Sequence, residues 1–333
     1  MLDILCIGDT VIDIFLRMSP NDPKFGIDRE KNKLVINFGD KLTVEKYVIG
    51  LGGNATNTAV GTSRLGVSTG LMAEAGNDEF AQKIINTLRN ENIDSKRVIF
   101  DNNKQTSITV ALSYDGERTL FTEYVERAHQ FNFESIEAKM IYLTSLGNKW
   151  QHVYERTLML IDQKPTLLAF NPGTIQLEYK NKTVIDVIEK TDYLFVNKEE
   201  AEEILYGKEL EINNENNKQL IKKLLFGLKA LGAKNVIITD SINGSYLQTA
   251  DNKTYHLEIV KVNVLEKTGA GDSYTAGFLS AVLKDLSLQE AMIWGAINSS
   301  SAIQHIGSQN GVLTQEKLNK IKNSLTNFAP SEI

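Results

Sequence analysis

Short apolar segments alternate with helical segments through much of the chain, and this alternation restricts the fold more than any other feature. The apolar runs AKMIYLTSL, TLLAFNPG, DYLFVN and KNVIITD are separated by stretches with helical periodicity. Such strands pack as a parallel sheet that helices cover on both faces. A first apolar run ends at Gly8 and places Asp9 and Asp13 near the edge of this sheet. We therefore expect a layered α/β fold with a mostly parallel central sheet.

Two segments, residues 15–50 and 97–127, instead alternate apolar and polar residues. This pattern is typical of antiparallel strands with one exposed face. Gly39-Asp40 in the first segment and Asp115-Gly116 in the second supply turn residues for two hairpins. We predict that residues 1–333 form a single α/β domain, with these two segments as insertions that pair into a small β lid.

Composition and charge exclude several classes of function. The 333 residues carry a net charge of −6 and contain no basic cluster interleaved with aromatics, so we expect no binding to nucleic acid. No signal peptide and no run of about 18 apolar residues occurs, which predicts a cytoplasmic protein without a membrane contact. The single cysteine, Cys6, lies in an apolar run and is interpreted as a buried small residue. No histidine has a metal-ligand neighbour at helical or hairpin spacing, so a zinc site is not expected.

The stretch EKTGAGDSYTAGF places two glycines and an acid before a run of small residues with helical character. Backbone amides and a helix N-terminus would converge there on an anion. Asp272 would lie in the first helical turn, where the helix dipole keeps a carboxylate ionised and ready to accept a proton. The alternative is that Asp272 only caps the helix.

A second glycine-rich stretch, GLGGNATNTA, precedes another helix. Its glycines allow a ligand to approach the backbone, while Asn54 and Asn57 offer amides to substrate hydroxyl groups. Asn54 is also a plausible N-cap of the helix. The same stretch formally matches GxGxxA with Glu74 downstream, as in nicotinamide-binding proteins, but it follows an alternating segment rather than the first strand of a parallel unit.

Two further segments follow predicted strands. In NKEE, Asn197 and Glu200 are three residues apart, a spacing that also fits a helix capping box. The segment TDSINGS, residues 239–245, is a turn with hydroxyl groups and a glycine. No GxxxxGK[ST] sequence is present, so any nucleotide binds without a P-loop.

Taken together and in this order, these motifs resemble the ribokinase-like (PfkB) family of carbohydrate and nucleoside kinases. The two signature regions are GGNATNTAVGTSRLG and KTGAGDSYTAGFLSA, accompanied by GDTVID, GNDEF, DGERT, FNPG, NKEE and GSQ. The resemblance spans nearly the whole chain. It implies a ribokinase-like three-layer α/β/α fold with a β lid, and phosphorylation of a hydroxymethyl group on a small sugar-like substrate. It further implies ATP and Mg²⁺ as cofactors, and a lid that often forms a homodimer interface.

The resemblance also implies a role for each group of motif residues. Asp272 corresponds to the catalytic base. The anion hole corresponds to the amides of Gly269, Ala270 and Gly271. The sugar-contacting positions are Asp13, Gly52, Gly53, Asn54 and Asn57. The positions on the nucleotide side are Asn197, Thr239, Ser241, Gly244 and Asn298. Glu200 corresponds to a residue that helps to place magnesium through water.

Several positions depart from the family pattern. Ser241 replaces a glycine of the nucleotide turn, a change expected to shift ATP. Val11, Asn54 and Gly147 replace residues that contact ribose, which argues against ribose as the substrate. Glu266-Lys267 replaces the usual Asp-Thr before the anion hole, so dependence on a monovalent cation is left open.

Two rival functions remain at this point. A nucleoside kinase of the same family would need an apolar floor for the base, to which Phe15, Phe38, Phe121 and Tyr124 are candidates. A catalytically inactive sugar-binding protein would keep the fold without turnover.

Overall fold

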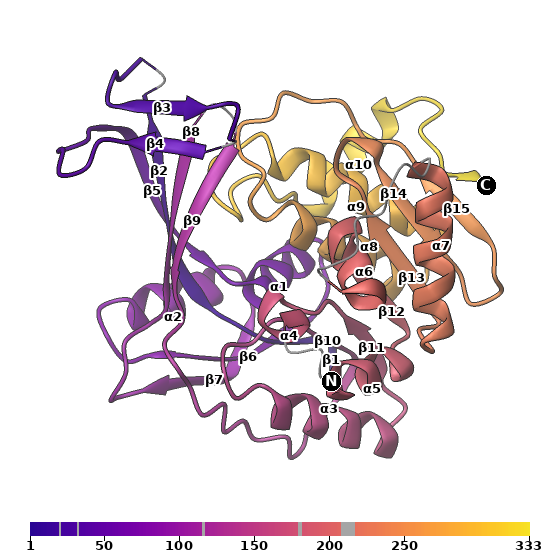
Figure 1. Cartoon of the computed structure of the whole chain (residues 1–333). Coiled ribbons are helices and arrows are strands. Elements are labelled where there is room, and N and C mark those ends of the chain that lie inside the picture. The colour runs from indigo at the N-terminus through magenta and orange to yellow at the C-terminus, as the bar shows by residue number, and fades with distance from the viewer. Residues whose placement is uncertain (20, 32, 115–116, 179–181, 208–216) are drawn as a thin grey trace.

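The computed structural model describes the chain except for residues 20, 32, 115–116, 179–181 and 208–216. In the described part, a large sheet of ten strands forms the centre of the molecule (Figure 1). Its order is β16 (Ser331–Glu332), β15 (Thr254–Leu257), β14 (Ser245–Gln248), β13 (Asn235–Thr239), β12 (Tyr193–Asn197), β11 (Leu167–Phe170), β10 (Ala138–Leu143), β1 (Leu2–Ile7), β6 (Thr69–Gly76) and β7 (Asp94–Asp101). The strands from β13 to β7 run parallel, and β14 to β16 form an antiparallel edge. The expected mostly parallel sheet is confirmed.

Helices cover both faces of this sheet because its central strands are apolar on both sides. In β1, Ile4 and Cys6 pack toward one face, and Leu5 and Ile7 pack toward the other. The first face carries α1 (Asn54–Arg64), α2 (Ala81–Asn90), α8 (Ala270–Leu283), α9 (Leu288–Ala302) and α10 (Gln315–Ser324). The second face carries α3 (Gln151–Gln163), α5 (Lys182–Lys190), α6 (Lys198–Tyr206) and α7 (Asn217–Ala230), with the short α4 (Thr174–Glu178) nearby.

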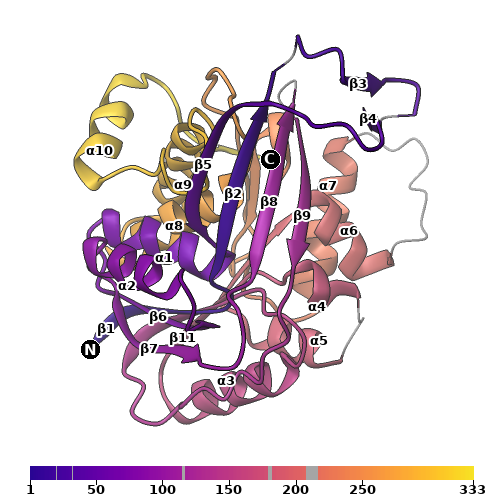
Figure 2. The same cartoon turned by 90° about the vertical axis from the view of Figure 1, so that its left-hand side faces the viewer.

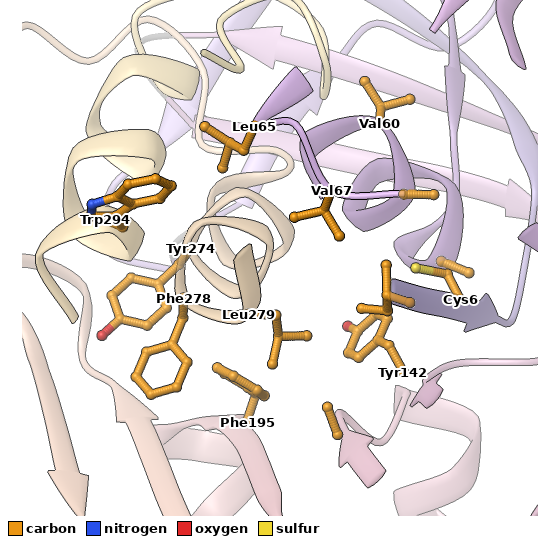
Figure 3. Packing of buried hydrophobic residues seen from close by; sticks show 14 of the residues in the cluster. Cys6, Val60, Leu65, Val67, Tyr142, Phe195, Tyr274, Phe278, Leu279 and Trp294 are labelled. Carbon is orange, nitrogen blue, oxygen red and sulfur yellow. The ribbon is translucent and has the colours of Figure 1, made fainter. Parts of the chain in front are cut away.

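The core of the first face fixes α8, the helix that follows the glycine-rich turn. Phe278 of α8 packs edge-on against Phe195 of β12, with ring centroids 5.3 Å apart (Figure 3). Gly277 lies against Trp294 of α9 so closely that a Cβ would be 2.6 Å from the Trp294 carbonyl oxygen. Cys6 is fully buried in this same core, which confirms its interpretation as a packed apolar residue. The middle of α8 is therefore packed closely against β12 and α9.

A second sheet stands away from the central sheet, and we refer to it as the lid (Figure 2). It contains β5 (Val44–Gly52), β2 (Val11–Met18), β8 (Ile108–Tyr114) and β9 (Glu117–Glu123), in that order. The pairs β2–β5 and β8–β9 are antiparallel, and the two hairpin-like units are joined by a parallel β2–β8 pair. Strands from the two alternating segments thus pair in one sheet through β2 and β8, while the role of this sheet as a lid stays a prediction.

The strand boundaries and one turn differ from the sequence-based expectation. Gly39-Asp40 does not join paired strands, because β4 (Lys33–Ile36) pairs with β3 (Phe25–Asp28) in a separate hairpin, whereas β5 pairs with the longer apolar β2. The lid begins at Val11 rather than residue 15, since β2 starts four residues after the end of β1. Residues 97–101 belong to β7 of the central sheet. The predicted turn at Asp115-Gly116 lies outside the described residues.

The helices within the described ranges are short. None of them is long and apolar enough to cross a membrane.

Candidate active site

The glycine-rich turn leads the chain into α8 with an open space above the helix N-terminus. Gly269 is the N-cap, with φ of 79°, and a Cβ there would lie 2.7 Å from the carbonyl oxygen of Ser308. Glycine is needed at this position because other residues strain in the left-handed region. The amide of Ala270 donates to the Lys267 carbonyl at 3.3 Å, so this predicted anion-hole amide is already engaged. A Cβ on Gly271 would meet nothing within 4 Å. This open helix N-terminus is suited to an anion.

Asp272 lies in the first turn of α8 and is buried. Asn57 Nδ2 donates to Asp272 Oδ2 at 2.9 Å, and Gln309 Nε2 donates to Asn57 Oδ1 at 2.9 Å. The second hydrogen bond fixes which end of the Asn57 amide faces Asp272. Asp272 does not cap the helix with its side chain, because Gly269 is the N-cap and no side-chain cap is formed.

The ionisation of Asp272 differs from the sequence-based expectation. Burial raises the pKa of its carboxyl group to about 7, although the Asn57 hydrogen bond lowers it; the charge of Asp13 raises it further. A pKa of about 7 differs from the expectation of a carboxylate that stays ionised well below neutral pH, and burial is the largest cause of this difference. A carboxylate with a pKa close to neutrality is well matched to the work of a general base.

Asp13 comes from β2 of the lid, and its charge interacts with Asp272. Ser308 Oγ donates to Asp13 Oδ2 at 3.3 Å, and burial raises the pKa of Asp13 to about 6. Gly52 on the neighbouring strand makes room for this carboxylate, since a Cβ at Gly52 would lie 2.1 Å from Asp13 Oδ2. A buried carboxylate with an unfilled acceptor capacity can receive hydrogen bonds from substrate hydroxyl groups.

The start of α1 adjoins Asp13 through Gly52. Gly53 is the N-cap of α1, and Asn54 is the first helical residue without a side-chain cap hydrogen bond. The expectation that Asn54 caps the helix is wrong, because the positive φ of Gly53 turns the chain into the helix one residue earlier. The side chain of Asn54 is partly exposed and remains free for a ligand, whereas Asn57 serves Asp272.

Asn197 and Glu200 form the capping box of α6. Asn197 Oδ1 accepts from the Glu200 amide at 2.8 Å, and Glu200 Oε2 accepts from the Asn197 amide at 2.9 Å. Burial raises the pKa of Glu200 to about 7, with the Asn197 hydrogen bond lowering it and the charges of Glu199 and Asp272 raising it. Glu200 is thus near enough to Asp272 for their charges to interact. The capping role is confirmed, and the metal role stays a prediction.

A pocket beside the glycine-rich turn collects the predicted nucleotide residues. Thr239, Ser241 and Gly244 line it together with Ala270 and Gly271 of α8. Aliphatic side chains form much of the remaining wall, namely Ile242, Ile259, Val260, Val262, Val264 and Ile303. A flat apolar surface next to an anion-binding helix N-terminus fits a nucleotide, with its base in the apolar part and its phosphates at the helix.

Two nucleotide-side predictions take a different form in the structure. Ser241 adopts a φ of 47°, in the left-handed region that favours glycine, so the turn keeps a glycine-like path despite the substitution. Asn298 does not line the pocket. Its Nδ2 donates to the Ser273 carbonyl at 2.8 Å, and its Oδ1 accepts from the Leu313 amide at 3.0 Å. The helix α9 does line the pocket, but through Ala296, Ser299 and Ser300, followed by Ile303 directly after the helix.

Other residues join the site without having been given a role from sequence. Ser308 and Gln309 belong to the GSQ motif, and they contact Asp13 and Asn57 respectively. Asp9 accepts from the Gly147 amide at 3.2 Å, and burial raises its pKa to about 7. The position of Asp9 at the end of β1 was a usable signal, whereas the GSQ contacts depend on pairings across the whole chain.

The structure contradicts the nicotinamide interpretation of GLGGNATNTA. The stretch joins the lid strand β5, which is antiparallel to β2, to α1. It therefore does not lie in a parallel β–α–β unit, as a dinucleotide fingerprint requires. Glu74 is buried and accepts a hydrogen bond from the His129 amide at 2.9 Å.

The family of the chain follows from a match over most of its length. A family model described as pfkB family carbohydrate kinase matches residues 1–315. The chain belongs to the PfkB family. The expected class of enzyme, an ATP-dependent phosphotransferase, is thereby confirmed for this PfkB kinase, and its substrate is a separate question.

Curated relatives of this PfkB kinase span almost its full length. It is 26% identical over 321 residues to a nucleoside kinase of Methanocaldococcus jannaschii, with 96% of each chain covered. It is 23% identical over 338 residues to a 5-dehydro-2-deoxygluconokinase of Clostridium botulinum, covering 96% of this chain and 92% of the relative.

Solved structures confirm the ribokinase-like fold. The crystal structure of the Methanocaldococcus jannaschii nucleoside kinase matches with a TM-score of 0.76 and 24% identity, covering 98% of this chain and 99% of that one. The ribokinase of Arabidopsis thaliana, solved with ribose and ATP, matches with a TM-score of 0.77 and 17% identity, covering 96% and 98%.

Proposed function

We propose that this PfkB kinase transfers the γ-phosphoryl group of ATP to a hydroxymethyl group of a sugar or sugar-like substrate, with Asp272 as the general base. One observation carries the proposal. Asp272 is buried, its pKa is about 7, and it lies in the first turn of a helix whose open N-terminus borders the predicted nucleotide pocket. Asp13 lies close enough for its charge to raise the pKa of Asp272. A proton acceptor, an anion site and a polar sugar site thus meet at one place.

The proposed reaction needs one proton transfer and one in-line displacement. Asp272 accepts the proton of the substrate hydroxyl group, and the oxygen forms a bond to the γ-phosphorus as the bond to the bridging oxygen of ADP breaks. Backbone N–H groups at the start of α8, with Gly271 as the open position, stabilise the charge of the transferring group. Asn57, held by Gln309, keeps the Asp272 carboxylate aimed at the hydroxyl group.

The residues near Glu200 fit a magnesium ion bound with the nucleotide. Mg²⁺ usually keeps several waters and takes only one or two protein carboxylates together with substrate phosphates. Glu200 offers a buried carboxyl group whose pKa is raised, and a nearby cation would favour its ionised form. Magnesium would neutralise phosphate charge during transfer. Among the described residues there is no group of three or more acidic, histidine or cysteine side chains that would form an all-protein metal cage.

The direct test is release of ADP from ATP and Mg²⁺ across a panel of sugars, sugar phosphates, sugar acids and nucleosides. Wild-type protein should release ADP with at least one sugar, and Asp272→Asn should lose the activity. Unchanged turnover in Asp272→Asn would overturn the assignment of the base.

The cytoplasmic location expected from the sequence stays a prediction.

A nucleoside substrate is the second candidate, favoured by the nucleoside kinase among the relatives. Of the aromatic residues considered for a base floor, Tyr124 has its pKa raised first by burial and then by the charges of Asp9 and Asp13, which places its ring near both carboxylates. Phe15 is buried, whereas Phe38, Phe121 and Tyr124 are exposed. The same panel decides, because Tyr124→Ala should weaken a nucleoside far more than a free sugar if the ring stacks on a base. Sugar-induced thermal stabilisation without ADP release from any compound would instead support an inactive sugar-binding protein.

We further propose that the outer face of the lid joins two copies of the chain. The register places Ile14, Ile49, Val110 and Phe121 side by side across the four strands. Phe121 is 56% exposed, and Tyr47 on the same face is 65% exposed, which leaves an apolar sheet face uncovered. Light scattering after size-exclusion chromatography should give a dimer for the wild type and a monomer for Phe121→Asp. A monomeric wild type at micromolar concentration would refute this proposal.

A further inference from the structure

Glu266 is a buried carboxylate three residues before Gly269, at the entry to the glycine-rich turn. The residue is only 3% exposed. Its Oε1 accepts hydrogen bonds from the Thr268 amide at 3.1 Å and from Thr268 Oγ1 at 2.8 Å. Two donors on one residue fix the path of the chain between Glu266 and the first residues of α8. The carboxylate therefore shapes the turn that presents the anion-binding amides.

The other partners of Glu266 come from the lid. Ser113 Oγ of β8 donates to Glu266 Oε2 at 2.5 Å, and Arg118 Nη1 of β9 lies 4.0 Å from Glu266 Oε1. Ser113 and Arg118 are direct cross-strand partners in the lid sheet, so both contacts come from one point of the lid. A carboxylate this deeply buried is costly unless such partners satisfy it.

The lid consequently reaches the reaction centre from two directions. Asp13 of β2 accepts a hydrogen bond from Ser308, next to the site of the sugar, and Ser113 of β8 holds Glu266 at the entry to the turn. Neither contact of Glu266 serves the packing of the central sheet. They connect the element that covers the substrate to the segment that binds the transferring phosphoryl group.

We propose that Glu266 is a positioning residue that makes the geometry of the anion-binding turn depend on the placement of the lid. The proposal rests on the proposed kinase function. When Ser113 and Arg118 are in place, Glu266 has all its partners and holds Thr268 and the following amides in the arrangement seen here. When the lid moves away, the carboxylate loses both lid partners and the turn loses its support. Phosphoryl transfer to water is thereby disfavoured while the sugar site is uncovered.

The kinetic test uses Ser113→Ala, because Ser113 lies on a partly exposed lid strand where loss of one hydroxyl group leaves the core intact. A hydrogen bond to a charged group is worth a factor of about 10, so kcat should fall about 10-fold. The KM for the sugar should change less than about 2-fold, because neither Ser113 nor Glu266 contacts Asp13. Ser113→Thr keeps the hydroxyl group and should restore kcat. The matched control is Thr119→Ala on β9, which also removes one hydroxyl group, but from an exposed residue that pairs with Leu112 and so lies on the opposite face of the lid from Ser113.

A second variant and a second readout keep the proposal separate from the question of activity. Glu266→Gln combined with Ser113→Ala should be no slower than Glu266→Gln alone, because both changes break one link. In ligand-free protein, Ser113→Ala should speed amide hydrogen exchange of residues 268–271, while Thr119→Ala should not. This exchange can be measured even if no tested sugar is phosphorylated, which would count against the function alone. Unchanged exchange in Ser113→Ala, or kcat effects that multiply in the double variant, would overturn the role of Glu266.

Discussion

Asn57 and Asp272 are joined by a 2.9 Å hydrogen bond although they lie 215 positions apart in the sequence. The bond ties the first helix after the lid to the helix that carries the proposed base. Gln309 in turn donates a hydrogen bond to the side-chain oxygen of Asn57. The orientation of the Asp272 carboxylate is therefore set by residues from three separate segments.

Asp272→Asn should slow catalysis strongly and stabilise the fold. Loss of a general base costs a factor of about 10² to 10⁴ in kcat. Because the folded-state pKa of about 7 is above the ordinary value of 3.8, the folded protein carries an unfavourable buried charge above pH 7 and is relieved of it as the pH falls. Asparagine removes this charge, so Tm at pH 8 should rise by about 2 °C or more, with a smaller rise at pH 5. Calorimetry at the two pH values checks this, and an equal change at both would contradict the buried charge.

The wild-type enzyme should lose activity in acid through the protonation of Asp272. In the free enzyme, kcat/KM should fall about tenfold per pH unit below about pH 7, because only the ionised carboxylate accepts the proton. Initial rates between pH 5 and 9 at fixed ionic strength provide the measurement. A flat profile down to pH 5 would show that the base ionises more easily than its buried environment allows.

Asn57→Ala should move that acid limb to higher pH. The hydrogen bond from Asn57 lowers the pKa of Asp272, so its removal leaves the raising effects of burial and of Asp13 unopposed. We expect kcat to fall about 10-fold at pH 7 and to recover in part at pH 9. Asn86→Ala on the exposed side of α2 is the matched control and should leave the profile unchanged. A limb that moves to lower pH would exclude this role for Asn57.

Gly52→Ala should damage the sugar site, and Gly50→Ala should not. A Cβ at Gly52 would lie 2.1 Å from Asp13 Oδ2, whereas a Cβ at Gly50 meets nothing within 4 Å. Displacement of the Asp13 carboxylate should raise KM for the sugar by about 10-fold or more. The KM for ATP should be nearly unchanged, and steady-state kinetics with each substrate varied in turn distinguishes the two. Equal sugar KM values for the two variants would refute the contact between Gly52 and Asp13.

Gly271→Ala and Gly269→Ala should fail for different reasons. A methyl group at Gly271 meets no protein atom, so the variant should fold normally while obstructing the space for phosphate and lowering kcat/KM for ATP by about 10². At Gly269 the positive φ and the Ser308 carbonyl oxygen should instead cost about 1–2 kcal/mol of stability or more. Thermal unfolding and ATP titration of both variants test this. A Gly271→Ala protein with normal ATP kinetics would move the anion site elsewhere.

Local patterns were sufficient to predict the layered fold, the position of Asp272 in the first turn of α8 and the turn at residues 239–245. The nucleotide role of that turn came from the family resemblance and stays a prediction. Each of these depends on residues that are close in sequence, such as the apolar strands or the two glycines before α8. Packing of Phe278 in the apolar core then fixes α8, and with it Asp272, against the central sheet. The capping box at Asn197 and Glu200 was readable for the same reason.

Features that depend on distant contacts were missed or misjudged. The raised pKa of Asp272 arises from burial by the surrounding fold, which no local pattern reports. Asn298 belongs to the expected helix but faces the interior, because it bonds to Ser273 and Leu313. The hairpin expected at Gly39-Asp40 does not form, because β5 pairs with β2 instead. The hydrogen bond between Ser113 and Glu266 joins residues 153 positions apart, and no local sequence pattern links them.

The parallel β2–β8 pair has a consequence for how such an enzyme can gain or lose its lid. The lid strands come from two separate segments, β2 with β5 and β8 with β9. Between these segments the chain forms α1, β6, α2 and β7 of the main body. No single deletion removes the lid, and no single insertion of a contiguous segment creates it. Both segments must be present, and they must pair with each other although these parts of the main body lie between them in the sequence. The lid is therefore inherited together with the fold and is not exchanged as a separate module.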